Sequence, residues 1–497
     1  MENNTEKDNY THILKYTGIF GGVQGLGILV GIVRNKLVAV ILGPSGMGLI
    51  SLFNSTINLV SNGTNFGISF SAIKNLSEIF DSGDNIKIQR VVKTIRLWSL
   101  IAAIIGMLVC IVFSDILSKF TFSWGDHTMH FILLSPVIGM MAVTGGEMAI
   151  LKGMRQLMSL ALIPIFTVLS ALVISVPIYL SFGESGIVPS LILMALASML
   201  ITMKWSLKAM PYRITFSQKY IHRGNNMIKL GLAFVFAGIM GSGAEFLIRS
   251  YLNNAASLST VGLYNAGYMM TMTYAGMVFS AMETDFFPRL SAHNNDNAMT
   301  AHTVNQQIEV TMLLISPILT GFIIFLPILL PLLYSGKFLP AMGMMNITAL
   351  AMYLRAVKLP VAYINLAKGA SKAYLFLESL YDVFVVFAVI IGYKLYGLTG
   401  TGIALMAASI FDFVIVSLYA YFKYSFRFTK DVVKYTLYEV PFGIAAYALT
   451  FTEKDIYYWI SGIILCIIST AVSVKIIHGK TSLWNKLGEK IKRKLHR

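Results

Sequence analysis

The fold is decided by two stretches, GLISLFNSTINLVSNGTNFGISFSAIKNLS at residues 48–77 and GLYNAGYMMTMTYAGMVFSAMETDFFPRLS at residues 262–291. Both begin Gly-Leu, both end Leu-Ser, and a constant offset of 214 residues relates them without a gap. Arg34 stands fourteen residues before the first copy, and Arg249 stands thirteen residues before the second. The pattern predicts an internal repeat, with one copy in each half of the chain.

The composition around these stretches excludes a soluble protein. The chain has 497 residues, of which 56% are hydrophobic and only 12% charged, and its mean hydropathy is +0.70; soluble domains carry about 25% charged residues. The polar start, MENNTEKDNYTHILKY, lacks the features of a secretory signal, so we expect it to remain on the protein and in the cytoplasm. Cys110 and Cys466 lie inside apolar runs and offer neither a disulfide framework nor metal-ligand spacing.

Apolar stretches of about 20 residues predict an all-α polytopic membrane protein with about fourteen transmembrane helices. They lie at 14–33, 46–66, 95–114, 129–151, 157–180, 186–206, 228–250, 257–282, 308–333, 341–365, 374–394, 399–422, 435–450 and 456–475. The segments between them are short, and alternating segments typical of a barrel are absent.

The distribution of basic residues predicts how the spans are oriented. If the N-terminus is cytoplasmic, 32 of the 39 lysines and arginines fall on the cytoplasmic side, as the positive-inside rule requires. The seven others are Arg34, Lys36, Lys119, Arg249, Lys337, Lys394 and Lys454. The net charge of +16 is therefore a topology signal and does not indicate nucleic-acid binding.

The repeat also predicts the domain organisation. Its offset covers an even number of spans, so both copies share one orientation, as in transporters built from parallel repeats. We expect a six-helix lobe at 1–206, a cytoplasmic linker at 207–227, a second six-helix lobe at 228–425, two additional helices at 426–477 and a basic amphipathic cytoplasmic tail at 478–497. The tail is expected to lie on an anionic leaflet.

Four motifs carry a resemblance to a known family. The stretch NKLVAVILGPSGMGL at 35–49 resembles the signature of Wzx-type flippases for lipid-linked oligosaccharides, in the multidrug/oligosaccharidyl-lipid/polysaccharide (MOP) exporter superfamily. VGLYNAGY at 261–268, PRLSA at 288–292 and NLAKGASKAY at 365–374 support the resemblance. The likeness covers about residues 10–425.

This resemblance implies a fold and a function. It implies two lobes around a V-shaped cavity in the bacterial inner membrane, with both termini cytoplasmic. The substrate would be an undecaprenyl-diphosphate-linked oligosaccharide, such as an O-antigen unit of lipopolysaccharide, moved by alternating access from the cytoplasmic to the periplasmic leaflet. Membrane lipid and the polysaccharide polymerase machinery would be partners. Many such flippases have twelve spans, so the two extra spans leave open a peptidoglycan lipid-precursor flippase, and a drug/cation antiporter of the same superfamily is a further alternative.

Basic residues inside the spans are candidates for binding the diphosphate. Charges are retained within membrane helices mainly where they face protein or a water-filled cavity. Arg34, Lys36 and Arg249 lie toward the outer halves of their spans, and Lys36 matches the basic position of the family motif. Arg355 and Lys358 mark the inner end of the tenth span. The alternatives are snorkelling to the headgroups for the first three and simple positive-inside charge for the last two.

Acidic residues inside the spans are candidates for coupling transport to H+ or Na+. Glu245 is four residues before Arg249 and shares its helical face, so it is either a coupling site or a structural partner of that arginine. Glu283 and Asp285 form either a second coupling site or a charge cluster at the membrane edge. Three further acidic residues lie in spans, Glu147, Asp382 and Asp412.

Enzyme motifs are absent from the sequence. No phosphate-binding loop G-x-x-x-x-G-K-[ST] occurs, and the eight histidines form no H-E-x-x-H pair. A polysaccharide polymerase or ligase is disfavoured because the longest exterior loop, about 115–128, is short. We therefore expect a transporter without enzymatic activity or a cofactor, apart from a coupling ion.

Overall fold

Every regular element of the computed structural model is a helix in the residues that it describes, which are 2–80, 83–211, 214–274 and 276–480. The predicted amphipathic tail lies almost entirely outside these residues. The α-helices are α1 (Glu2–Thr64), α2 (Ile68–Phe80), α3 (Asn85–Val112), α4 (Ser114–Thr121), α5 (Thr128–Gly153), α6 (Leu157–Phe182), α7 (Ile187–Ala209), α8 (Gln218–Ala255), α9 (Leu258–Tyr268), α10 (Met277–Ala292), α11 (Asn297–Leu333), α12 (Met342–Ala367), α13 (Ser371–Tyr424), α14 (Lys430–Leu449) and α15 (Ile456–Lys480). A π-helical turn, η2 (Met269–Tyr274), joins α9 to α10, and two 3-10 turns are η1 (Gly183–Gly186) and η3 (Gly336–Ala341).

Most of the predicted spans fall on helices that are long and apolar enough to cross a membrane, which confirms the all-α membrane fold. Among the described residues, the predicted spans at 228–250, 257–282 and 435–450 are not part of such a stretch. Eight helical stretches of the described chain are long and apolar enough to cross a membrane. Two of the longest helices each contain two predicted spans and are broken between them. In α1 the break is at Gly43, whose φ of 64° suits glycine, and Pro44 follows it. In α13 it is at Tyr396 and Gly397, where φ is 58° at the glycine.

The chain forms two compact units. Unit 1 consists of Met1–Gly262 and Leu332–Ser335, and unit 2 consists of Leu263–Pro331 and Gly336–Arg497. The boundary at Gly262 falls within α9, later in the chain than the predicted linker at 207–227.

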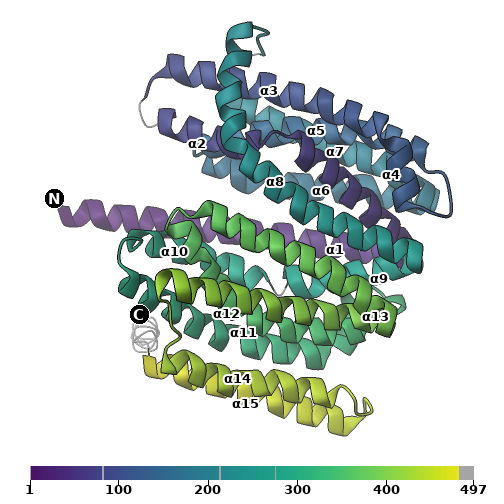
Figure 1. The fold of residues 1–497 in the computed structure, drawn as a ribbon, viewed down its shortest axis with the longest axis vertical. Coiled ribbons are helices and arrows are strands. Elements are labelled where there is room, and N and C mark those ends of the chain that lie inside the picture. Colours follow the sequence, from purple (N-terminus) through teal and green to yellow (C-terminus); the bar gives the residue numbers. More distant parts are fainter. Residues whose placement is uncertain (1, 81–82, 212–213, 275, 481–497) are drawn as a thin grey trace, which may run out of the picture. The chain divides into compact units, whose positions relative to one another are not determined.

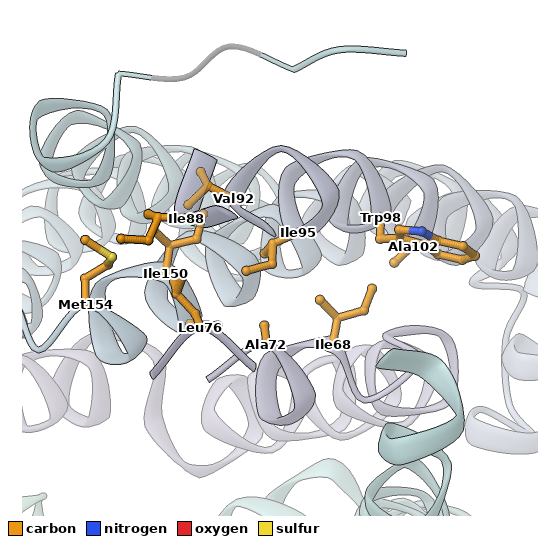
Figure 2. Close-up of a cluster of buried hydrophobic side chains, with 11 residues drawn as sticks. Ile68, Ala72, Leu76, Ile88, Val92, Ile95, Trp98, Ala102, Ile150 and Met154 are labelled. Carbon is orange, nitrogen blue, oxygen red and sulfur yellow. The ribbon is translucent and has the colours of Figure 1, made fainter. Parts of the chain in front are cut away.

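A cluster of apolar side chains forms the core of unit 1 at the junction of α2, α3 and α5. Figure 2 shows α2 and α3 directing their aliphatic side chains toward each other, with Ile150 and Met154 of α5 completing the cluster. Its buried members are Ile68, Ala72, Leu76, Ile88, Val92, Ile95, Trp98, Ala102, Ala149, Ile150 and Met154. Gly153 allows α5 to approach Leu76 closely, because a Cβ there would lie 2.8 Å from the Leu76 Cβ.

The segments at the start of the two repeat copies meet within unit 1. Ser45 and Ser259, which are 214 residues apart, are joined by a hydrogen bond of 3.4 Å between their hydroxyl groups. The glycines that open the two copies pack reciprocally: a Cβ on Gly48 would overlap the Leu258 carbonyl, and one on Gly262 would overlap the Pro44 carbonyl. Each contact is the other shifted by the repeat offset. The predicted repeat is thus a relation in space as well as in sequence.

In unit 2 the helices α12 and α13 pack along each other, and α14 and α15 run side by side (Figure 1). The small residues Gly343 and Gly402 lie in the α12–α13 contact, where a Cβ on Gly402 would lie 2.7 Å from the Met344 carbonyl oxygen. Most of α12 is buried, including the polar residues Asn346, Lys358 and Asn365. Such burial places charged groups of unit 2 in the protein interior.

Candidate functional site

A polar cavity of about 300 Å³ lies within unit 2. Its walls come from the end of α9, the π-helical turn η2, α12 and both parts of α13. The lining residues are Tyr268, Met272, Arg355, Lys358, Leu359, Tyr363, Tyr374, Glu378, Tyr381, Ser409 and Asp412. Local π-helical turns are frequent at functional sites, because the extra residue re-aims the side chains around it.

Lys358 of α12 is the centre of this cavity's charge network. Its Nζ lies 2.7 Å from Glu378 Oε1 and 2.8 Å from Asp412 Oδ2, and both acidic residues belong to α13. The Lys358 side chain is 8% exposed, that of Asp412 11%, and that of Glu378 33%. One ammonium thus joins the two parts of α13, which lie on either side of the break at Gly397.

The network retains capacity for a further cation. Asp412 Oδ1 is buried and has no hydrogen-bond partner in the described structure. Arg355 lies one turn before Lys358, is partly buried, and contacts Met272 Sδ at 3.5 Å through Nη1. With Arg355 counted, two basic and two acidic groups face the cavity. Such a balanced set can exchange partners when an ion or an anionic substrate enters.

The surroundings of Lys358 differ from those expected of a lysine whose charge is available to bind a diphosphate. Its charge is already balanced by two carboxylates, whereas Arg355 pairs with no carboxylate among the described residues. Of the two acidic partners of Lys358, the sequence drew attention to Asp412 but not to Glu378. Glu378 lies one helical turn before Asp382 in an apolar span, and this spacing is the signal that could have revealed it.

In unit 1, Arg34 of α1 contacts side chains of two other helices. Its Nε donates to Ser175 Oγ of α6 at 3.1 Å, and its Nη2 lies 3.3 Å from Met194 Sδ of α7. Tyr179 is adjacent, and its hydroxyl accepts a 2.7 Å hydrogen bond from Ser190. Neither protein contact of Arg34 neutralises its charge. Lys36 lies two residues further along α1 and is partly buried.

Arg249 of α8 is held differently from Arg34. Its Nη1 lies 2.8 Å from Glu245 Oε2, as the shared helical face predicted. The Arg249 side chain is 9% exposed, whereas that of Glu245 is 44% exposed. Glu283 and Asp285 belong to α10, but their side chains lie outside the described part of the structure.

Arg34→Ala is expected to impair transport more than Arg249→Ala. Loss of a charged hydrogen-bond contact to an anionic substrate costs about 1.5–3 kcal/mol, or roughly tenfold or more in binding. Arg34 offers an unneutralised charge, whereas part of the Arg249 charge is balanced by Glu245. Lysine at position 34 should restore only part of the activity, since it lacks the planar fork of arginine. Complementation assays normalised to protein level would measure this, and wild-type activity of Arg34→Ala would remove Arg34 from the site.

A second buried ion pair in unit 1 was not predicted. Arg96 of α3 forms a bidentate ion pair with Glu147 of α5, with Nε–Oε1 at 2.8 Å and Nη2–Oε2 at 3.0 Å. Arg96 also donates to Ser206 of α7 and to the Met210 carbonyl. The side chains are 3% and 5% exposed. The saturated bonding indicates that this pair joins three helices and is not a ligand site.

The described residues contain no group of three or more histidine, cysteine or acidic side chains that could hold a metal ion.

Comparison with known proteins identifies the family. Residues 37–343 match the family model described as polysaccharide biosynthesis protein. The chain belongs to this family. The search of curated proteins gives no match. The region that matches the polysaccharide biosynthesis protein family begins directly after Lys36, includes both copies of the repeat and ends at the start of α12.

Solved structures show that this member of the polysaccharide biosynthesis protein family has the MOP superfamily fold. The lipid II flippase MurJ, in an inward closed conformation, superposes with a TM-score of 0.69 at 16% identity, covering 93% of this chain and 99% of that one. An inward-facing multidrug resistance MATE family transporter of the MOP superfamily gives 0.68 at 15% identity, covering 80% of this chain and 94% of that one. A MOP superfamily transporter from Pyrococcus furiosus gives 0.53 at 16% identity, with coverage of 82% and 93%. The chain is therefore a multi-pass membrane protein with a transporter fold.

Proposed function

We propose that this protein is a flippase that moves an undecaprenyl-diphosphate-linked oligosaccharide from the cytoplasmic to the periplasmic leaflet. Membership of the polysaccharide biosynthesis protein family and the MOP fold support a lipid-linked carbohydrate as the substrate. The observation that carries the proposal is the buried Lys358–Glu378–Asp412 network beside Arg355 in unit 2. Charged side chains at membrane depth are costly, and their retention in a polar cavity indicates a pathway for charged groups.

In this proposal the chain works in the bacterial inner membrane with both termini in the cytoplasm. The cationic candidates Arg34, Lys36, Arg249 and Arg355 would contact the diphosphate at successive stages of alternating access. Lys358 would pair in turn with the substrate and with the acidic residues, because a diphosphate near Arg355 would compete with Glu378 and Asp412 for its ammonium group. Each ligand-bound state would then be favoured by its own set of ion pairs.

Accumulation of the substrate tests the proposal. In a strain that lacks this protein, the lipid-linked oligosaccharide should accumulate and remain in the cytoplasmic leaflet, and expression of the intact chain should clear it. A Lys358→Met variant expressed at equal level is expected not to clear it. Accumulation of lipid II instead would replace the proposed substrate with a peptidoglycan precursor. Unchanged distribution of both lipids would contradict a flippase.

A lipid II flippase is the second candidate, because one observation favours it. The likeness to MurJ covers 93% of this chain, against 80% for the MATE transporter, so it extends over more of the helices. The choice between the two substrates rests on the accumulation experiment. A drug/cation antiporter would leave both lipids normally distributed.

We expect transport to depend on an H+ or Na+ gradient through Asp412. Its Oδ1 has no partner in the described structure, and Lys358 can shift between Asp412 and Glu378 when a cation binds. Asp412→Asn should slow flipping at least tenfold and remove its dependence on the gradient. Flipping in vesicles with imposed pH and Na+ gradients measures this.

Glu245→Gln is the matched comparison, since Glu245 is the other described carboxylate proposed for coupling and already pairs with Arg249. If Glu245→Gln alone removes the gradient dependence, coupling belongs to α8 and not to the unit 2 cavity. Full activity of the wild type without any gradient would contradict coupling itself.

A further inference from the structure

Glu439 is a carboxylate at the middle of α14 that the transport site does not use. It is the tenth of the 20 residues of α14, so it lies about 15 Å from either end of the helix. Its exposed fraction is 0%. The helix therefore carries an acidic group at its centre, and this group faces protein.

The surroundings of Glu439 supply hydroxyl groups but no cation. Ser473 of α15 donates to Glu439 Oε1 at 3.0 Å, and Ser316 of α11 donates to the Glu439 backbone carbonyl at 3.2 Å. Ser316 also lies 3.2 Å from the hydroxyl of Tyr353 on α12 and 3.5 Å from that of Ser469 on α15. All of these side chains are buried.

Charge balance around Glu439 differs from that of every other buried acid described above. Asp412 and Glu147 each have a basic partner within 3 Å, whereas no lysine, arginine or histidine of the described residues forms an ion pair with Glu439. Its Oε2 has no hydrogen-bond partner in the described structure. The titratable group that faces it from another helix is the phenol of Tyr353, and Tyr435 lies one turn away on α14 itself. An ionised carboxylate in this setting would be unpaired, so the neutral acid is the favoured form.

We propose that Glu439 is a proton-binding site whose occupancy holds the helix pair α14–α15 against α11 and α12. With the proton bound, the cluster is neutral and its hydroxyl groups link four helices. On loss of the proton, an unpaired negative charge would remain between helices that share only hydroxyl donors. The packing of α14 would then weaken. Because α14 lines an apolar cavity of about 340 Å³ between α12, α13 and α14, the wall of this cavity would weaken as well.

The arrangement favours a proton over Na+ as the bound species. Na+ requires several oxygen atoms directed at one point, and Glu439 Oε2 is the one carboxylate oxygen without a partner in the described structure. The other described oxygens are engaged: Ser473 donates to Oε1, and Ser316 donates to the backbone carbonyl. A proton needs only the carboxylate itself. Binding of Na+ would make the stability of the protein depend on the Na+ concentration, whereas binding of a proton would not. Experiment can therefore separate the two.

The pH dependence of thermal unfolding tests the proposal in the purified full-length protein. The unfolded chain ionises Glu439 above about pH 4.3, whereas the folded protein keeps it neutral. Each pH unit above that value should therefore lower the folded-to-unfolded ratio about tenfold, until Glu439 ionises in the folded state. Glu439→Gln, which is neutral at all pH values, should lose this component. Glu453→Gln, a change in the exposed loop between α14 and α15, should behave as the wild type.

Three results would overturn the proposal. One is an identical pH profile for the wild type and Glu439→Gln. Another is stabilisation of the wild type by Na+ but not K+ that Glu439→Gln abolishes, which would make the site a Na+ site. The third comes from infrared spectra of protein labelled with 13C-glutamate at pH 8, where the wild type should show the carboxylic-acid C=O band. Its absence would show that Glu439 is ionised. Should Glu439→Gln fail to fold, Glu439→Asp removes the labelled group and assigns the band.

Discussion

Lys358→Met is expected to abolish transport and to lower the free energy of unfolding by about 3–5 kcal/mol, which is the cost of breaking a buried ion pair by removing one partner. Without the ammonium group, Glu378 and Asp412 would be left in the cavity without the cation that both contact at 2.7–2.8 Å. Flipping assays at equal protein level and thermal unfolding in detergent would measure the two effects.

Two variants separate the charge of Lys358 from its role in folding. Lys358→Arg keeps the charge and should fold, and the triple change Lys358→Met, Glu378→Gln and Asp412→Asn should recover stability but not transport. If Lys358→Met alone transports at the wild-type rate, the network is not part of the substrate or cation path. If the triple variant transports, the charges serve only the fold.

Gly48→Ala is expected to eliminate transport while leaving the protein folded. A Cβ at Gly48 would overlap the Leu258 carbonyl, so the conformation described here would be excluded. Because that overlap involves backbone and not a flexible side chain, the segments around Gly48 and Leu258 must separate to accommodate it. A transporter that cannot reach one of its states completes no cycle.

The matched control is Gly321→Ala in α11, where the added Cβ would meet no atom within 4 Å beyond its chain neighbours and the backbone of its own helix. Alanine is favoured over glycine in a helix interior by about 0.5–1 kcal/mol, so this change should be neutral or slightly stabilising. Labels placed near the repeat contact, read by distance measurements, would show the shift in Gly48→Ala. An unchanged distance distribution with full activity would show that the close contact is dispensable.

The fold could be predicted in detail because its signals are local or repeated. Apolar runs of about 20 residues give the helices, and a constant offset between two gapless copies gives the repeat. Gly43-Pro44 and Gly397 show how the breaks inside α1 and α13 arise from residue types whose backbone preferences are visible in the sequence. The pairing of Glu245 with Arg249 followed from helical spacing alone.

The partners of the buried charges could not be predicted, because they come from helices distant in sequence. Arg96 and Glu147 are 51 residues apart, and Arg96 was counted only among the cytoplasmic basic residues. Lys358 meets Glu378 and Asp412 through the packing of α12 against α13, which no periodicity encodes. Glu439 was overlooked because the hydroxyl groups that surround it carry no charge and leave no pattern.

The hydrogen bond between Ser45 and Ser259 joins two residues that the repeat offset of 214 relates to each other. The two glycine contacts beside it exchange places under the same offset. A side chain added at either glycine would meet the backbone carbonyl of the opposite segment. We therefore expect Gly262→Ala to have the same effect on transport as Gly48→Ala.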